Sequence, residues 1–372
     1  MSRYAYWIAI LLFASLVAAK FSPHSGFTSL IRFGETWQER RHSALQNIPI
    51  ATVAGSNGYD GQFYAQIALD PLLRSSELEN VIDAPAYRAR RILVPVLAAI
   101  LGLGSPFQIL QAYALINVFC WFVLGWLLYR QLDPNDTRAV YRWAGCMFSM
   151  GVLESVRQSL VDLPALLLLV LAILYWRKPH SNRSVLWLAL ANLTKETSLL
   201  GALALHCDNS RRPFPGRRIF LSFVIAILPV ALWSLYVQQR FVHTSGPGSL
   251  GNFSWPLLGL LTQAQNALRE ISLGNLDGRH SFSLIAIIGL GVQAWVLWRS
   301  PRFESTWWRV GAGYSLLLVG LSSWVWSGYW AVCRAVLPMT IAFNLLLPAT
   351  RTFWPLWTLG NLTMLHAVWR FL

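Results

Sequence analysis

The sequence predicts an all-α fold, a polytopic bundle of about ten or eleven transmembrane helices with a long first extracytoplasmic loop that carries short interfacial helices. Two observations lead to this prediction. Hydrophobic residues make up 55% of the 372 residues and charged residues only 12%, which is about half the charged share of an ordinary soluble domain. The hydrophobic residues also form long continuous blocks, such as 109–128, 160–176 and 219–235.

These continuous blocks favour helices over a membrane β-barrel. In hydrocarbon every backbone N–H and C=O needs a partner within the protein, so only helices and closed barrels can span a bilayer. Barrel strands alternate apolar and polar residues, and the blocks here do not. We therefore expect residues 1–372 to form one transmembrane domain, with spans near 4–19, 107–129, 139–156, 161–176, 184–193, 198–207, 219–237, 282–298, 310–326, 332–347 and 353–369.

Two apolar segments differ from the other predicted spans. The first resembles a signal peptide, because Arg3 precedes it and Ala18-Ala19 ends it, but the many later spans favour an uncleaved helix. The second, residues 92–103, is too short to cross comfortably, so we expect an interfacial or re-entrant helix.

Arginine-rich connectors predict the topology. With the N-terminus in the cytoplasm, the basic connectors 130–142, 177–183, 211–218, 299–309 and 351 all fall inside, as the positive-inside rule expects. Residues 20–106 and 238–281 then form a first and a second external loop. If the segment 92–103 crossed the membrane, this arginine bias would be reversed.

The formal net charge of +14 does not indicate a nucleic-acid partner. A nucleic-acid-binding protein would gather its basic residues in one patch or stripe, whereas these sit in short connectors. They can act as topology signals or as ligands for the phosphate of an anionic lipid or substrate.

The run Tyr59-Asp60-Gly61-Gln62-Phe63-Tyr64 is the first candidate for chemistry. Asp60 stands at a turn before a short predicted helix, where the helix dipole favours an ionised carboxylate. A carboxylate at the membrane surface beside aromatic walls could act as a general base. The alternative is a structural turn in which Asp60 is the helix N-cap.

Basic residues follow this run. Arg88, Arg90 and Arg91, beside Tyr87, could grip a phosphate bidentately or could anchor lipid headgroups. Lys195 and Glu196 interrupt an apolar hairpin, where they could line a cavity or form a pair that caps the hairpin. Ionisable residues at span ends could be buried ion pairs or phosphate ligands, and these are Glu154, Arg157, Asp162 and Arg334.

Short runs of the sequence resemble the GT-C superfamily of polytopic glycosyltransferases, in particular a bacterial branch of it. The runs are Y-D-G-Q-F-Y (59–64), A-Y-R-A-R-R-I-L-V-P (86–95), V-D-L-P-A-L-L-L (161–168) and L-T-K-E-T (193–197). The last two are similar to motifs of the lipid A aminoarabinose transferases and protein mannosyltransferases. The likeness extends to the layout of most of the chain.

The resemblance implies a sugar transfer from a polyprenyl-phosphate donor, on the outer face of a bacterial cytoplasmic membrane, to a hydroxyl of an unknown glycan, lipid or protein acceptor. Asp60 matches the loop acid that acts as base, and Lys195 and Arg334 match basic residues near the donor phosphate. Arg88, Arg90 and Arg91 would share that phosphate, and a single displacement would invert the anomeric centre. We expect Tyr59, Gln62, Phe63, Tyr64, Tyr87, Arg157, Asp162 and Glu196 to line the substrate site.

The sequence does not decide whether the reaction depends on a metal ion. Asp60 has no partner in a D-D or D-x-D pair, and the sequence has no H-E-x-x-H motif or P-loop, so we predict no metal ligands. Two other functions remain. The broken hairpin at Lys195 is compatible with a transporter or flippase, and a non-catalytic scaffold related to the GT-C enzymes would share the layout.

Overall fold

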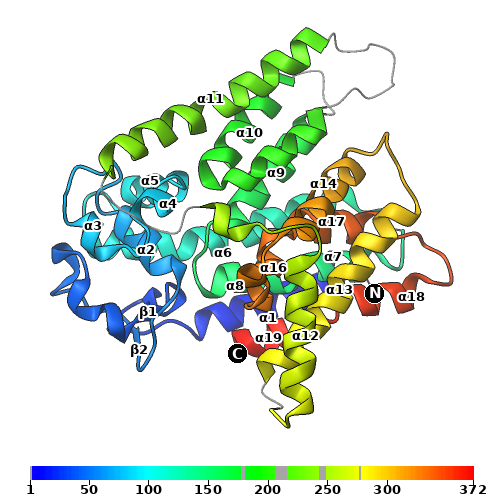
Figure 1. The fold of residues 1–372 in the computed structure, drawn as a ribbon, viewed down its shortest axis with the longest axis horizontal. Coiled ribbons are helices and arrows are strands. Elements are labelled where there is room, and N and C mark those ends of the chain that lie inside the picture. The colour runs from blue at the N-terminus through cyan, green and yellow to red at the C-terminus, as the bar shows by residue number, and fades with distance from the viewer. Residues whose placement is uncertain (1, 134, 177–180, 206–215, 243–248, 276–277) are drawn as a thin grey trace.

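The computed structural model describes residues 2–133, 135–176, 181–205, 216–242, 249–275 and 278–372. Parts of the expected connectors 177–183 and 211–218 and of the second loop, 238–281, lie outside these ranges. Helix accounts for 73% of the structure and strand for 2%, which confirms the all-α class. Figure 1 shows the helices gathered into one body, with the segment between α1 and α6 at one side of it.

The first helix and the segment after it are made of short elements. They are α1 (Ser2–Ala18), η1 (Thr28–Leu30), β1 (Phe33–Gly34), η2 (Glu35–Arg40), η3 (Ser43–Leu45), β2 (Thr52–Val53), α2 (Asp60–Ile67), α3 (Leu78–Val81), α4 (Pro85–Arg88) and α5 (Leu93–Leu101). The two strands pair in parallel, with Phe33 opposite Thr52. Helix α5 has nine residues, about half the length that a bilayer requires.

The remaining described elements are all helices. Its elements are α6 (Pro106–Gln131), α7 (Ala139–Met147), α8 (Met150–Arg157), α9 (Asp162–Trp176), α10 (Ser181–Thr194), η4 (Glu196–Leu205), α11 (Gly216–Arg240), η5 (Ser249–Asn252), α12 (Leu258–Ser272), α13 (Gly278–Arg299), α14 (Thr306–Gly320), α15 (Ser323–Trp326), α16 (Tyr329–Ala335), α17 (Leu337–Leu346), α18 (Phe353–Gly360) and α19 (Thr363–Phe371). Helix α12 lies within the expected second loop, where we predicted no helix.

Three helices in the described ranges are long and apolar enough to span a membrane: α6, α13 and residues Phe220–Arg240 of α11. The pair α16 and α17 would make a fourth as one span bent by 67°. The predicted spans 139–156, 310–326 and 353–369 are each divided into two helices. The expected ten or eleven spans are therefore reached only if broken and short helices also cross the membrane.

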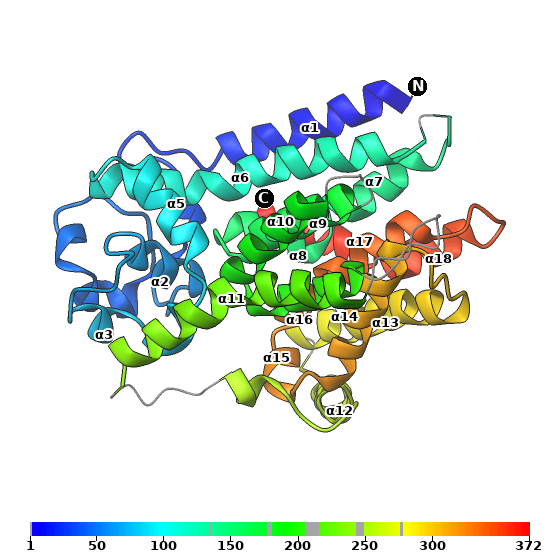
Figure 2. The same cartoon turned by 90° about the horizontal axis from the view of Figure 1, so that it is seen from above.

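Exposed apolar surface is consistent with a membrane protein. On α11 the side chains of Phe220, Ile225, Leu232 and Leu235 are each more than half exposed, although they would favour an apolar surrounding. On the other side of the molecule, α1 runs antiparallel to α6 (Figure 2), with Phe13 stacked on Trp121. Tyr4, Trp7 and Ile8 of α1 are also exposed.

Two glycines fix the start of α2. Gly58 has a φ of +69°, in the left-handed region that L side chains rarely adopt. Gly61 packs so closely on the turn between α8 and α9 that a Cβ there would lie 2.1 Å from the carbonyl oxygen of Gln158. Gln62 completes the anchor, because its amide accepts from the Gly34 N–H and donates to the Asn57 carbonyl. The position of Tyr59 and Asp60 is thus set by backbone contacts on both sides.

We expect Gly61→Ala to destabilise the protein by about 1–3 kcal/mol, because the added methyl group must displace backbone. Gly291→Ala is a suitable control, since a Cβ there meets nothing within 4 Å. It should leave stability unchanged or raise it, as alanine is the better helix former. Thermal unfolding of both variants in detergent compares them. Equal midpoints would show that the contact of α2 with the Gln158 carbonyl does not constrain the fold.

Candidate active site

Asp60 is the first residue of α2 and not its N-cap. Tyr59 is the N-cap residue, with extended backbone, and no side chain caps the helix. The structural alternative that made Asp60 a capping residue is therefore wrong. All the other residues of the helix are buried, so the carboxylate is held on a rigid element at the edge of the protein interior.

Asp162 begins a second helix that faces the same site. The turn between α8 and α9 contains Ser159 in the left-handed region, with a φ of +46°. It is held by two hydrogen bonds, from the Ser159 hydroxyl to the Leu30 carbonyl and from the Asn117 amide to the Leu160 carbonyl. This turn delivers Asp162 to the first position of α9, and only 6% of its side chain is exposed.

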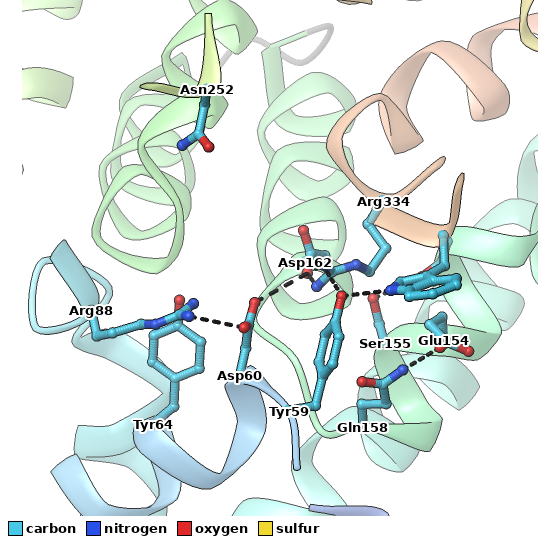
Figure 3. Close-up of polar contacts among 12 residues, drawn as sticks. Tyr59, Asp60, Tyr64, Arg88, Glu154, Ser155, Gln158, Asp162, Asn252 and Arg334 are labelled. Atoms are coloured by element: carbon cyan, nitrogen blue, oxygen red, sulfur yellow. Dashed lines mark hydrogen bonds and ion pairs between the residues drawn. The ribbon is translucent and has the colours of Figure 1, made fainter. Parts of the chain in front are cut away.

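The two aspartates belong to a row of alternating charges (Figure 3). Arg88 lies 2.9 Å from Asp60 and 2.8 Å from Asp83. Arg334 of α16 lies 3.9 Å from the other oxygen of Asp60 and 3.2 Å from Asp162. Lys195, in the break between α10 and η4, lies 2.5 Å from Asp162 and ends the row.

Asp60 keeps one oxygen available. Its Oδ1 pairs with Arg88, but its Oδ2 is 3.9 Å from Arg334, beyond hydrogen-bond distance, and 27% of the side chain is exposed. Burial alone would raise the pKa of Asp60, but the charges of Arg88 and Arg334 outweigh burial and hold that pKa below its usual value. The carboxylate is therefore ionised at neutral pH, as a general base must be.

Arg91 organises a second group of polar side chains beside this row. It lies 3.0 Å from Glu196 and donates to the hydroxyls of Tyr64, at 2.8 Å, and Tyr87, at 2.5 Å. Lys195 therefore pairs with Asp162 and Glu196 with Arg91. The alternative in which Lys195 and Glu196 pair with each other is wrong.

Both groups line one cavity of about 920 Å³, near the upper end of the roughly 300–1,000 Å³ typical of ligand pockets. One part of its wall is charged and aromatic. Other parts are apolar and include Leu199, Leu200, Leu317 and Leu321. A smaller cavity of about 210 Å³ lies between α1, α6 and α7, but its lining has no acidic or basic side chain.

The charges of the large cavity do not cancel. Its lining includes six basic and four acidic side chains, an excess of two positive charges. Four of the basic side chains form the ion pairs described above. Arg90 and Arg279 have no carboxylate partner among the described residues, and the buried Nε of Arg90 has no hydrogen-bond partner there. Arg279 donates to the neutral Ser327 carbonyl, so no described residue compensates its charge.

Most of the predicted site residues do meet in this cavity. Its lining contains Tyr59, Asp60, Tyr64, Tyr87, Arg88, Arg90, Arg91, Asp162, Lys195, Glu196 and Arg334.

Three predicted residues do not line the cavity. Gln62 is fully buried as the anchor of α2, and Phe63 is buried against the edge of the Trp37 ring. Arg157 pairs instead with Glu154, which also accepts from Arg370 and Gln158, in a separate buried group. Gln62, Phe63 and Arg157 therefore lie outside the lining of this cavity.

Several lining residues were not predicted. Arg279 is the second residue of α13, Trp330 belongs to α16, Asn252 ends η5 and Phe253 follows it. None belongs to a motif that indicates this chemistry, and each is far in sequence from Asp60. Trp330 could have been noticed, because Tyr329-Trp330 stands directly before the predicted Arg334.

Within the described ranges no group of three or more His, Cys, Asp or Glu side chains is arranged to hold a metal ion. No protein-family model, curated protein or solved structure matches this chain. A functional assignment therefore depends on the chemistry of the cavity itself.

We expect Asp162→Asn to destabilise the protein by about 3–5 kcal/mol, because it leaves Lys195 and Arg334 together without their shared carboxylate. Adding Lys195→Met should recover part of this loss by removing one uncompensated charge. The free energy of unfolding of the single and double variants measures the effect. A single variant as stable as the parent protein would contradict a structural role for this part of the row.

Proposed function

We propose that this chain is a membrane-embedded glycosyltransferase of GT-C type, which moves a sugar from a polyprenyl-phosphate donor to an acceptor hydroxyl. The observation that carries the proposal is an ionised carboxylate, Asp60, with one oxygen that accepts no hydrogen bond from the described residues, at a large cavity that has surplus positive charge and an apolar wall. The surplus charge suits a phosphate and the leucine-rich wall suits a prenyl chain. The exposed apolar faces of α1 and α11 support a membrane location.

The reaction follows from these positions. Oδ2 of Asp60 accepts the proton of the acceptor hydroxyl while the hydroxyl oxygen forms a bond to the anomeric carbon of the sugar. The bond from the anomeric carbon to the phosphate oxygen breaks, and the polyprenyl phosphate leaves with its electron pair. One such displacement inverts the anomeric centre. Positive charge near the phosphate stabilises the negative charge that develops on it.

The ion pairs change which residues we assign to the phosphate. We expected Lys195, Arg88, Arg90, Arg91 and Arg334 to bind it, but all of these except Arg90 are engaged with carboxylates. Arg90 and Arg279, the two guanidiniums of the lining that lack a carboxylate partner among the described residues, therefore supply most of the attraction for an anion. The paired arginines instead position the carboxylates of Asp60 and Asp162 through their ion pairs.

The proposal includes the topology expected from the sequence, a multi-pass protein of the bacterial cytoplasmic membrane with its N-terminus inside and the cavity at the external surface. The arginine-rich connectors support this orientation. Broken spans of the kind formed by α16 and α17 would allow short helices to complete the bundle.

A transporter for a lipid-linked or anionic substrate is the second candidate. It is favoured by the break between α10 and η4, which places Lys195 and its ion pair where two apolar helices meet. Membrane vesicles given a polyprenyl-phosphate sugar with a labelled sugar separate the two functions. A transferase moves the label to an acceptor, whereas a carrier leaves it on the lipid.

Asp60→Asn should lower the rate of sugar transfer by about 10²–10⁴-fold, because the amide cannot accept the proton. Asp83→Asn is the matched control, since Asp83 pairs with the same guanidinium of Arg88 but has no role as a base. It should retain most of the activity. Equal losses in the two variants would mean that Asp60 acts only by holding Arg88.

Arg90→Gln and Arg279→Gln should each raise the KM for the donor by about tenfold, as expected for the loss of one charge-assisted contact. Arg351→Gln, an exposed arginine that does not line the cavity, provides the control. Steady-state kinetics over a range of donor concentrations gives the values. Unchanged KM values in both cavity variants would contradict the assignment of the phosphate to these two residues.

A further inference from the structure

The Tyr59 hydroxyl has an unusual set of hydrogen bonds. Its oxygen accepts from the indole N–H of Trp330 at 2.8 Å and from Nη2 of Arg334 at 2.9 Å (Figure 3). Indole and guanidinium groups can only donate, so neither bond can be reversed. Both acceptor positions of the phenolic oxygen are therefore occupied, and the hydroxyl hydrogen must be donated elsewhere.

None of the described residues accepts that hydrogen. The carboxylates of Asp60 and Asp162 pair with Arg88, Arg334 and Lys195, and neither accepts a hydrogen bond from Tyr59. Tyr59 lines the 920 Å³ cavity, so its hydrogen is available to a molecule bound there. Burial raises the pKa of Tyr59 to about 12, although the charge of Arg334 opposes this rise. The hydroxyl is therefore a neutral donor at physiological pH.

The same arrangement recurs across the cavity. Arg91 donates to the hydroxyls of Tyr64 and Tyr87, and neither hydroxyl donates to a described residue. Both tyrosines line the cavity with Tyr59. Arginine thus fills an acceptor position on each of three phenolic oxygens, which leaves the hydrogens for a ligand that accepts hydrogen bonds.

A group that only accepts fits Tyr59 best. A sugar hydroxyl that accepted from Tyr59 would have to donate to a different group, because the Tyr59 oxygen has no free acceptor position. A phosphodiester has acceptor oxygens and no donor, and Arg334 beside the tyrosine favours negative charge. Building on the proposed function, we propose that Tyr59 donates a hydrogen bond to a phosphoryl oxygen of the lipid-linked substrate. The bond would strengthen as charge develops on the departing phosphate.

Binding of two probes with the same alkyl chain tests this role without requiring turnover. Dodecyl phosphate carries the phosphate and dodecanol does not. Tyr59→Phe should weaken dodecyl phosphate binding by about tenfold or more, as expected for a lost charge-assisted hydrogen bond, and should leave dodecanol binding unchanged.

Tyr113→Phe is the matched control, because it removes the same hydroxyl from a buried tyrosine that does not line the cavity and whose hydroxyl has no partner among the described residues. It should change dodecyl phosphate binding by less than about threefold. Equal losses in Tyr59→Phe and Tyr113→Phe, or normal phosphate binding by Tyr59→Phe, would overturn the proposal. A result in which phosphate binding depends on Tyr59 but no sugar is transferred would remove the proposed function and leave this binding role intact.

If Tyr59→Phe does not fold, replacement of Tyr59 by 3-fluorotyrosine supplies the second test. Fluorine makes the phenol a stronger donor and a weaker acceptor, and the group stays in place. Dodecyl phosphate should then bind more tightly. Unchanged or weaker binding would show that the hydroxyl serves only as an acceptor for Trp330 and Arg334.

Discussion

The row of alternating charges from Asp83 through Arg88, Asp60, Arg334 and Asp162 to Lys195 is the interaction on which the site depends. These side chains come from five separate segments of the chain, and each interior charge is shared by two neighbours. A charge removed from water is tolerated only when it is paired, so none of these elements can move without exposing or isolating a charge. The row thereby joins the first loop to the helices of the second half of the chain.

This constraint explains how one cavity can hold both a base and an anion site. Pairing keeps Asp60 ionised, and the geometry leaves its Oδ2 without a hydrogen bond from the described residues. Because four basic side chains are committed to carboxylates, the surplus charge is confined to Arg90 and Arg279. The arginines also occupy the oxygens of Tyr59, Tyr64 and Tyr87. A cavity that offers surplus positive charge and free hydroxyl hydrogens is suited to phosphate.

The sequence allowed the all-α class and eight of the ten charged side chains of the cavity lining to be predicted, because both depend on local patterns. The differences have geometric causes. In a helix that begins at Asp60, Tyr64 lies on the same face four residues later, whereas Gln62, two residues later, points elsewhere. Helical spacing could therefore have separated Gln62 from the lining residues. Phe63 is on the Asp60 face by spacing, and only the tertiary structure shows that it is buried against Trp37. Arg279 could not have been found in this way, since only the packing of α13 brings it to the cavity.

The central claim is that a lipid phosphate binds beside the Asp60 carboxylate. The most direct test is an electron cryo-microscopy structure of the protein in a lipid nanodisc with a polyprenyl phosphate. Our account predicts phosphate density in the cavity, within hydrogen-bond distance of the Tyr59 hydroxyl and on the external side of the membrane. Lipid phosphate bound at another place, with this cavity facing the cytoplasm or filled by protein, would contradict it.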